Sequence, residues 1–268
     1  MAKQAAGRAR KNPSVKRAAA KSAAAGAAGS PHLFRTAVYA LLALLFVRTF
    51  LFEPFSIPSG SMIPTLLVGD YVLVSKFSYG YSRYSFPWLH PPFRGRILGA
   101  LPARGDVAVF RLPRDPSVDY IKRIVGLPGD TVQMRHGRLY LDGKEVPRTP
   151  DGTFTATGEG PPMLLRRYRE TLPGGPTHAI LMASDNGPLD NTPRYRVPPG
   201  YLFAMGDNRD NSLDSRVMGA AGVGYIPLAN LVGRADLIFF STRGTAPLWE
   251  FWLWPSEIRW NRLFTRIH

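Results

Sequence analysis

An apolar stretch near the N-terminus constrains the fold of this chain more than any other feature. Residues 33–52 read LFRTAVYALLALLFVRTFLF, with polar side chains only at Arg35, Thr36, Arg48 and Thr49. As an α-helix rising about 1.5 Å per residue, the stretch spans roughly 30 Å, the thickness of the hydrocarbon core of a bilayer. We therefore predict one transmembrane helix over residues 33–52. A buried core helix is an alternative, and a cleaved signal peptide fits less well because no plain A-x-A site follows.

The charge on the two sides of this stretch predicts its orientation and argues against a core helix. The chain has 34 Lys and Arg against 19 Asp and Glu, a net charge of +15. Eight of the basic residues and no acidic residue lie in residues 1–35, whereas residues 53–72 contain no Lys or Arg. Because segments rich in Lys and Arg stay in the cytoplasm, we predict that residues 1–32 form a basic, disordered cytoplasmic tail. Residues 53–268 then face outward.

The composition of the tail also limits its partners. Its positive charges favour contact with anionic membrane lipid. No aromatic residue lies between these charges, as a stacking platform for nucleic-acid bases requires, so we predict no nucleic-acid partner. An organelle transit peptide has a similar composition, so a bacterial and an organellar source both stay open.

Short β-type segments dominate the rest of the chain. Runs such as YVLVSKF, DVAVFRL and YLFAMGD are separated by Gly, Pro and Asp, a pattern typical of antiparallel strands. We predict a mostly β fold with two antiparallel β-sheet regions, preceded by the single helix. The β domain comprises residues 53–146 and 200–245 and is interrupted over 147–199 by an inserted, loop-rich subdomain, where Pro and Gly are frequent. Asp142-Gly143 predicts a hairpin turn.

The C-terminal segment, residues 246–268, is rich in tryptophan. It holds four of the five tryptophans in the chain, namely Trp249, Trp252, Trp254 and Trp260. Because tryptophan favours the membrane interface, we expect this segment to be membrane-proximal and to rest on the bilayer. Packing of the same side chains against the sheet is an equal alternative.

Missing residue types exclude several kinds of chemistry. The chain has no cysteine, which excludes disulfides, thiolate metal sites and a cysteine nucleophile. Its five histidines are scattered, with no pair at a metal-ligand spacing, and the Asp- and Asn-rich run GDNRDNSLDSR lacks the spacing of a calcium loop. We predict no metal and no cofactor.

A serine and a lysine are the remaining candidates for nucleophilic chemistry. Ser61 lies in the stiff turn PSGSMIPTL, nine residues after Phe52 and thus within about 30 Å of the helix end. A nucleophilic serine needs a base, and Lys122 in the strand-like DYIKRIVGL is the candidate. Its ordinary pKa, about 10.4, must be lowered by burial for this role. Taken singly, Ser61 reads as a turn serine and Lys122 as a surface strand lysine.

Four motifs together carry a family resemblance. EPFSIPSGSMIPTLLVGDYVLVSKFSYG, RGDVAVFRLP, DYIKRIVGLPGD and GDNRDNSLDSR follow one another along the chain. In this order they resemble bacterial signal peptidase I, a family of Ser/Lys membrane proteases that remove signal peptides from exported preproteins after small residues (A-x-A), through an acyl-enzyme. The likeness covers residues 48–130 and 200–240. It implies a catalytic domain on the periplasmic face of the inner membrane, secretory preproteins as substrates, and a functional link to the translocation machinery. With the one apolar helix of this chain, we expect a single-pass protein.

The resemblance also assigns individual residues. It implies that Ser61 is the nucleophile and Lys122 its general base. The side chain of Ser59 and the backbone N–H of Ser61 match the oxyanion hole, and Ser212 matches a serine that hydrogen-bonds and orients the lysine. Asp214 and Arg216 match a supporting ion pair. The positions that match apolar substrate pockets, selective for small residues at −1 and −3, are Phe55, Ile57, Met62, Leu66, Val72, Val109, Tyr120 and Ile121.

The chain departs from the family pattern in two ways, and two other functions are alternatives to this interpretation. The better-known relatives have two membrane helices where this chain has one, and SRVMGAAGVGYIP is lengthened after Gly219. A Ser/Lys peptidase specialised for other substrates is one alternative. A membrane-tethered β scaffold that binds peptides without cutting them is the other, although a scaffold does not need Ser61, Lys122 and Ser212 together.

Overall fold

The structure of the protein is a computed structural model. It describes residues 31–86, 91–93, 95–158, 160–244, 252 and 254–268. The chain divides into two compact units, Met1–Phe46 and Val47–His268. The tail that we expect to be disordered, together with Trp249, lies outside the described residues.

The first unit contains the predicted apolar helix. Helix α2 spans Pro31–Phe46 and continues as one π-helical segment, η1, over Val47–Leu51. His32–Leu51 is the one helical stretch within the described residues that is long and apolar enough to cross a membrane, and none of its hydropathic window is buried. The helix ends one residue earlier than predicted, because Phe52 already pairs as a strand with Ser75.

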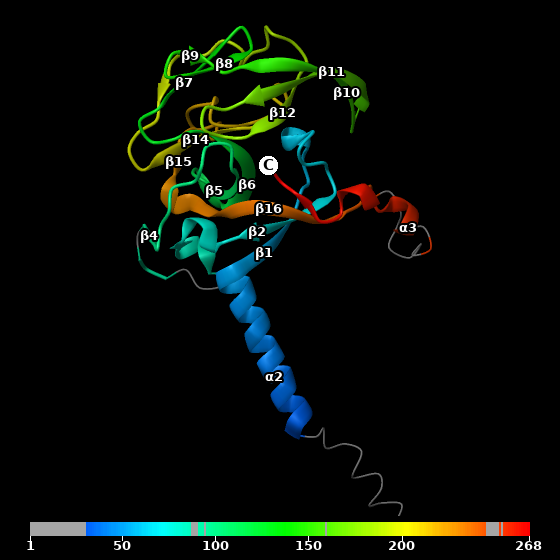
Figure 1. The fold of residues 1–268 in the computed structure, drawn as a ribbon. Helices are drawn as coiled ribbons and strands as arrows, with labels where there is room; N and C mark the ends of the chain where they lie inside the picture. Colours follow the sequence, from blue (N-terminus) through cyan, green and yellow to red (C-terminus); the bar gives the residue numbers. More distant parts are fainter. Residues whose placement is uncertain (1–30, 87–90, 94, 159, 245–251, 253) are drawn as a thin grey trace, which may run out of the picture. The chain divides into compact units, whose positions relative to one another are not determined.

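The second unit is built on a large antiparallel sheet (Figure 1). Its strands follow the order β1-β2-β16-β5-β6-β14-β15, and β17 pairs with β16. Their bounds are β1 Phe52–Ser56, β2 Asp70–Ser75, β5 Val107–Leu112, β6 Asp115–Gly126, β14 Tyr201–Met205, β15 Ile226–Pro227, β16 Leu231–Ser241 and β17 Thr265–Arg266. The prediction of a mostly β, antiparallel fold is confirmed.

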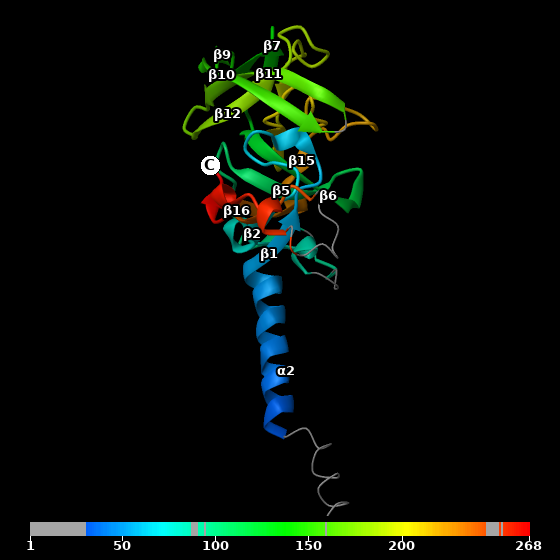
Figure 2. The ribbon, with the colours of Figure 1, turned by 90° about the vertical axis from the view of Figure 1, so that its right-hand side faces the viewer.

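Two smaller sheets lie together on one side of the large sheet, as the two perpendicular views show (Figures 1 and 2). The four-stranded sheet is ordered β13-β7-β8-β9 and the three-stranded sheet β10-β11-β12. Their bounds are β7 Thr131–Arg135, β8 Arg138–Leu141, β9 Lys144–Glu145, β13 Tyr195–Arg196, β10 Arg148–Gly158, β11 Gly160–Thr171 and β12 Thr177–Met182. Asp142 and Gly143, both at positive φ, form the predicted turn between β8 and β9.

The interval 147–199 corrects our prediction of a loop-rich insertion. Strands β10 and β11 pair over most of their length, from Arg148↔Glu170 to Gly158↔Gly160. The register shifts between Pro150 and Thr153, so the proline and glycine there mark a bulge and not a loop. The longest irregular stretch of the interval within the described residues lies between β12 and β13.

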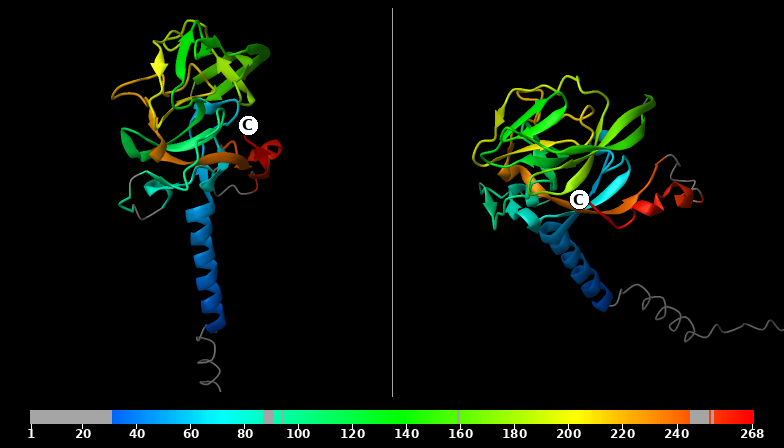
Figure 3. Two further views of the ribbon diagram at one scale, coloured as in Figure 1. Left: turned by 60° about the vertical axis from the view of Figure 1, so that its left-hand side comes forward. Right: turned by 45° about the horizontal axis from the view of Figure 1, so that its top comes forward.

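Short elements complete the unit. A two-stranded hairpin pairs β3, Tyr81–Ser82, with β4, Arg96–Ile97. The single-turn helices are η2 Gly60–Met62, η3 Phe77–Tyr79, η4 Arg83–Ser85, η5 Leu228–Asn230, α3 Trp254–Glu257 and η7 Trp260–Arg262. Strand β16 crosses the large sheet and leads into the C-terminal segment (Figure 3). Trp252 and Trp260 are exposed in that segment, so these two side chains do not pack into the core.

The large sheet buries apolar side chains on both faces. Val72, Val74, Val107 and Val109 belong to one buried cluster, with Phe55 and Ile121 packed against it. Phe110 belongs to a second cluster formed by β5, β6 and β14. Alternation along β5 therefore sends Val109 and Phe110 to opposite faces, which is why its run VAVFRL contains almost no polar residue.

Phe110 provides a test of this two-sided core. Replacing the buried Phe110 with alanine is expected to lower the free energy of unfolding by about 3–5 kcal/mol, because it leaves a cavity in the second buried cluster. Urea unfolding of the detergent-solubilised protein measures this loss. Phe77→Ala is the matched control, since Phe77 is half exposed and its loss should be clearly smaller. Equal losses for the two variants would contradict the two-sided core.

Candidate functional site

Ser61 lies in the one-turn helix η2, between β1 and β2. The turn is fixed at its base, where Ile57 N–H donates to Asp70 O at 2.8 Å and Gly69 N–H to Ile57 O at 2.9 Å. It is fixed at its tip by Asn208, whose backbone N–H donates to Ser61 O at 3.1 Å and whose side-chain amide donates to Gly60 O at 3.2 Å. The loop that follows β14 thus holds the serine turn directly.

Lys122 contacts this serine. The Nζ of Lys122 lies 2.8 Å from Ser61 Oγ and 3.0 Å from the carbonyl oxygen of Ile121. The side chains are 3% and 8% exposed, respectively. The predicted alternation along β6 also holds, because Nζ lies over the ring of Tyr120, 5.2 Å from its centroid. The two residues that are 61 positions apart in sequence are therefore hydrogen-bonding partners.

The surroundings of Lys122 favour its neutral amine. Burial lowers the pKa of Lys122 to about 8, and Asp214 and Asp207 oppose this shift only in part. Removing an ammonium group from water penalises its charged form. At neutral pH a fraction on the order of one in ten is then unprotonated, against roughly one in a thousand for an exposed lysine. This lysine can accept a proton from the serine hydroxyl that it contacts.

A cavity of about 160 Å³ opens beside the pair. It lies between two strand edges, because β1 pairs only with β2, and the part of β6 before Arg123 pairs only with β5. Backbone groups at such open edges can capture an extended peptide as an additional strand. The residues that line the cavity are Phe55, Ser56, Ile57, Pro58, Ser59, Val109, Asp119, Tyr120, Ile121 and Lys122.

Five of the eight predicted pocket residues line this cavity, and three do not. Phe55, Ile57, Val109, Tyr120 and Ile121 lie in its wall. The other three, Met62, Leu66 and Val72, are fully buried in the core cluster behind it. Matching a family motif identifies the neighbourhood of a residue, but exposure depends on how the turn packs, and here these three side chains turn inward.

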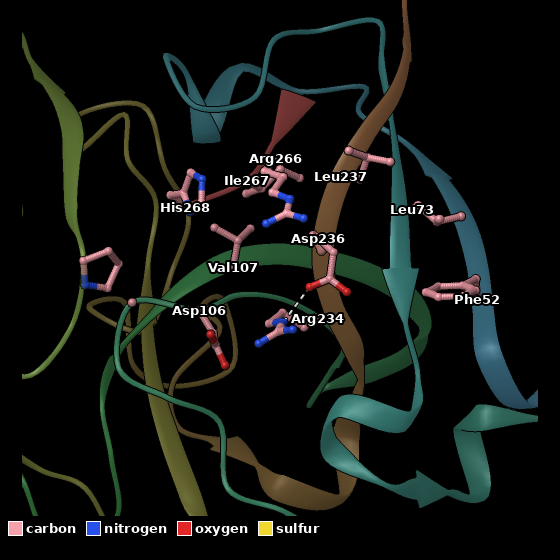
Figure 4. Close-up of a pocket in the computed structure, with 13 residues that line it drawn as sticks. Phe52, Leu73, Asp106, Val107, Arg234, Asp236, Leu237, Arg266, Ile267 and His268 are labelled. Carbon is pink, nitrogen blue, oxygen red and sulfur yellow. Dashed lines mark hydrogen bonds and ion pairs between the residues drawn. The ribbon is translucent and has the colours of Figure 1, made fainter. Parts of the chain in front are cut away.

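A second, larger cavity of about 630 Å³ lies elsewhere on the large sheet (Figure 4). Val107, Leu73 and Leu237 line it together with charged groups, among them the ion-paired Arg234 and Asp236 (2.6 Å). Neither Ser61 nor Lys122 reaches it. We therefore assign the candidate active site to the smaller cavity.

The other predicted site residues lie around the pair, but not all of them make the contacts that we expect. Ser59 is exposed, and its Oγ lies 3.4 Å from Ser61 Oγ, a position from which its hydroxyl can face the same reacting group. Ser212 is buried, and its hydroxyl acts on the carboxylate of Asp214, whose pKa it helps to lower. The hydrogen bonds of Lys122 to described residues go to Ser61 and to the carbonyl of Ile121, so the expected bond from Ser212 to Lys122 is absent. The chain places Ser212 against Gly206, which leaves no room for a larger residue there.

Asp214 and Arg216 form the expected ion pair. Arg216 Nη2 and Nε each lie 2.9 Å from a different oxygen of Asp214, and both side chains are fully buried. Burial would raise the pKa of Asp214, but Arg216 and the backbone N–H of Gly206 keep it below its ordinary value. Asp214 is thus a buried anion that faces Lys122 from the far side.

The sequence did not reveal a second set of buried ion pairs behind the site. Arg123, next to Lys122, makes a bidentate contact to Asp207, with both bonds at 2.8 Å. Asp207 also accepts a hydrogen bond from Thr65 Oγ1 at 2.5 Å. It thereby connects the serine turn, strand β6 and the loop after β14. The density of Asp, Asn and Arg in GDNRDNSLDSR is the signal in the sequence, but it does not show which of these residues pair with distant partners.

The same buried region continues into the three-stranded sheet. Arg209 donates to Glu170 of β11 at 3.0 Å through Nη1. His178 of β12 lies 3.6 Å from Glu170 and 3.9 Å from Asp207. Burial, followed by the charge of Arg123, lowers the pKa of His178 to about 4. A neutral imidazole therefore separates the two ion pairs at neutral pH.

A C-terminal arginine completes the support of the serine turn. Arg262 donates to Thr65 O at 2.9 Å and to Asp70 Oδ2 at 2.6 Å. Asp70 Oδ2 also accepts the N–H of Leu67 at 2.8 Å. Strand β17 pairs with β16 beyond this point. Residues from three distant parts of the sequence hold the segment that carries Ser61.

Together these features define a peptidase-type site: a serine hydroxyl, a lysine with a lowered pKa and two strand edges open to an extended peptide. Within the described residues no cluster of three or more His, Asp or Glu side chains could hold a metal ion.

Comparison with known proteins agrees with this class of site. A family model described as signal peptidase, peptidase S26, matches residues 31–240. Signal peptidase I of Rickettsia typhi is 37% identical over 254 residues, which cover 88% of this chain and 93% of that protein. Signal peptidase I of Rickettsia canadensis is 39% identical over 243 residues, covering 84% and 88%. A crystal structure of a signal peptidase I from Enterococcus faecalis V583 covers 50% of this chain and 97% of that one, at 23% identity and a TM-score of 0.29.

The chain therefore belongs to the signal peptidase family, peptidase S26.

Burial of Lys122 has a measurable cost in stability. Its pKa in the folded protein, about 8, lies below that of an unfolded chain, so the folded state disfavours the charged amine. The destabilisation is complete below pH 8 and disappears as the pH rises through about 10.4. We expect Lys122→Met to raise the free energy of unfolding at pH 7 by on the order of 1–3 kcal/mol and to lose this advantage near pH 10.

Thermal or urea unfolding of the full chain in detergent, at pH 7 and pH 10, measures this difference. Lys144→Met is the control because Lys144 is exposed, and it should change stability little at either pH. A Lys122→Met protein that is less stable than wild type at pH 7 would show that the charged amine is well accommodated in the folded state.

Proposed function

We propose that this protein is a membrane-anchored serine endopeptidase that removes signal peptides from exported preproteins through a Ser61–Lys122 dyad. The observation that carries the proposal is the contact of 2.8 Å between Lys122 Nζ and Ser61 Oγ at the cavity. Membership of the signal peptidase family supports the substrate class. The apolar helix α2 supports anchoring in a membrane.

The proposed reaction uses the neutral amine as a general base. Lys122 takes the proton of Ser61 as Oγ attacks the carbonyl carbon of the scissile peptide bond, forming a tetrahedral oxyanion. Collapse of this intermediate releases the new N-terminal amine, which receives the proton from Lys122 and leaves an ester between Ser61 and the signal peptide. Lys122 then takes a proton from water as the water oxygen attacks the ester carbonyl. The C–O bond to Ser61 breaks, the proton returns from Lys122 to Ser61 Oγ, and the signal peptide leaves with a new carboxylate.

The oxyanion is proposed to bind the Ser59 hydroxyl and the Ser61 backbone N–H. Ser59 lies beside the nucleophile, 3.4 Å between the two hydroxyl oxygens, and the η2 turn holds the Ser61 peptide group in place. Preorganised donors of this kind stabilise such transition states by several kcal/mol, and the loss of one typically costs about 2.7–4 kcal/mol.

The substrate is proposed to lie extended between β1 and β6, with small residues at −1 and −3. The cavity holds only about 160 Å³, and Phe55, Ile57, Val109 and Ile121 make this part of its wall apolar. An added strand gains backbone hydrogen bonds from both open edges, while its alternate side chains enter the cavity. Because the −1 and −3 side chains would share this one space, small residues such as alanine are favoured at both positions.

Location and partners follow as proposals from the same features. The basic tail before α2 favours a cytoplasmic N-terminus, so that the unit with Ser61 lies on the outer, periplasmic face of the inner membrane. Its partners there are secretory preproteins, membrane lipid and the translocation machinery that delivers the preproteins.

The dyad is tested by cleavage of a preprotein with an A-x-A signal peptide. Detergent-solubilised wild type, Ser61→Ala and Lys122→Met are each incubated with it, and the new N-terminus is mapped by mass spectrometry. We expect wild type alone to cut after the second alanine, with the variants at least about 10³-fold slower because each lacks half of the dyad. Cleavage by Lys122→Met at the wild-type rate would remove the lysine as base. Inactivity of wild type on several preproteins would favour a specialised peptidase or a binding scaffold.

The pH dependence provides an independent test. Only the neutral amine can accept the serine proton, so kcat/KM should rise about tenfold per pH unit below the pKa of Lys122, about 8, and level off above it. We therefore expect activity at pH 6 to be about a hundredfold below the plateau. Initial rates at substrate concentrations far below KM, from pH 5.5 to 10, measure the profile. A plateau that already begins near pH 6 would contradict Lys122 as the titrating base.

A further inference from the structure

The cavity beside the dyad changes in character along its length. Near Ser59 and Lys122 its wall consists of Phe55, Ile57 and Ile121. At the other end the lining residue is Asp119, the only carboxylate in the wall among the described residues. Asp119 is not among the residues to which the family resemblance assigns a role.

Charged residues face Asp119 from each neighbouring strand. Arg111 of β5, its partner in the sheet register, makes an ion pair with it at 3.1 Å. Glu53 of β1 and Lys76, which follows β2, also act on its charge. Lys76 is fully buried and bonds Glu53 Oε2 at 2.8 Å. The Asp119 side chain stays 28% exposed.

The strand registers explain this arrangement. On β1, Glu53 is two residues before Phe55, and on β6, Asp119 is two residues before Ile121. Residues two apart in a strand share a face and lie about 7 Å apart. On each of the two strands, a charged residue therefore precedes the apolar residue by one step along the same face.

The charged end also lies next to the residues that follow the apolar helix. Lys76 Nζ donates to Arg48 O at 3.1 Å, and Arg48 belongs to η1, directly before β1. A signal peptide that reaches the site from the membrane enters with its N-terminal part at this end. This step rests on the function proposed above.

We propose that Asp119 is a specificity-determining residue that favours substrates with a lysine or arginine side chain at position −5. In an extended substrate, side chains at −1, −3 and −5 share one face and follow one another at about 7 Å. With −3 beside Ile121, the −5 side chain lies beside Asp119.

The place of Asp119 in the cavity wall supports a cationic partner. Burial raises the pKa of Asp119, Arg111 and Lys76 lower it, and Glu53 raises it further. Glu53 is paired with Lys76 and Arg48, so Asp119 is the carboxylate that lines the cavity. A substrate ammonium or guanidinium group can form a second ion pair with Asp119 in a region partly shielded from water, whereas a glutamate at −5 would be repelled by it.

The test uses four peptides that share one A-x-A cleavage site and differ only at −5, which is Lys, Gln, Ala or Glu. For the full-length wild type we expect kcat/KM to fall in that order, with roughly a tenfold ratio between Lys and Glu, carried mainly by KM. The ratio should shrink in high salt, because part of the attraction is screened.

Two variants assign the preference to Asp119. Asp119→Asn should bring the Lys-to-Glu ratio to within about twofold, because it removes the charge that distinguishes the two peptides. Arg111→Gln should enlarge the ratio, because it removes the partner that competes for the carboxylate. Asp115→Asn is the matched control: Asp115 lies on the same strand but is exposed and outside the cavity, and the ratio should stay at the wild-type value.

The outcomes separate this proposal from the proposed function. Equal cleavage of the four peptides by wild type, or an unchanged ratio in Asp119→Asn, overturns the role of Asp119. Loss of activity on all four peptides by the same factor in Asp119→Asn overturns it too, in favour of a structural role. If wild type cuts none of them at the alanine site, the proposed function fails first, whatever residue stands at −5.

Discussion

The exclusion of water from Lys122 is the constraint on which the rest of the site depends. An exposed lysine next to a serine would remain protonated at neutral pH and could not accept the proton of the serine hydroxyl. Here strand β6 carries the lysine into the interface between the large sheet and the loop after β14, where the ammonium form loses its hydration. The stability of the whole fold offsets the free-energy cost of burying this lysine, because only well-packed surroundings can keep its side chain away from water.

The ion pairs behind the dyad explain how a polar interior stays ordered. Asp207, Asp214 and Glu170 are fully shielded, and each has an arginine partner. Such pairs contribute little net stability compared with apolar packing, but the loss of one partner leaves a costly unpaired charge. Their value here is geometrical. Asp207 contacts both Arg123, which is next to Lys122, and Thr65, which follows the Ser61 turn, so one carboxylate connects the segments that carry Lys122 and Ser61.

The sequence singled out Ser61 and Lys122, which the fold brings into contact, but it did not predict their surroundings. Both residues lie within local motifs, and the strand alternation around Lys122 followed from side-chain types alone. The contacts of Ser212, the inward packing of Met62 and the pairing of Arg123 with Asp207 depend on how distant segments meet. No local pattern contains that information. The strands within 147–199 were missed because Pro150 and Gly152 usually mark loops, whereas here the pairing absorbs them in a bulge.

The position of Arg262 has a consequence for how the protein is made. The serine turn forms early in the chain, but the arginine that ties Thr65 and Asp70 in place is about two hundred residues further on. During synthesis the helix and the serine turn leave the ribosome long before their last support. A chain still being translated therefore carries Ser61 without the contacts from Arg262. The order of translation itself delays the completion of this site.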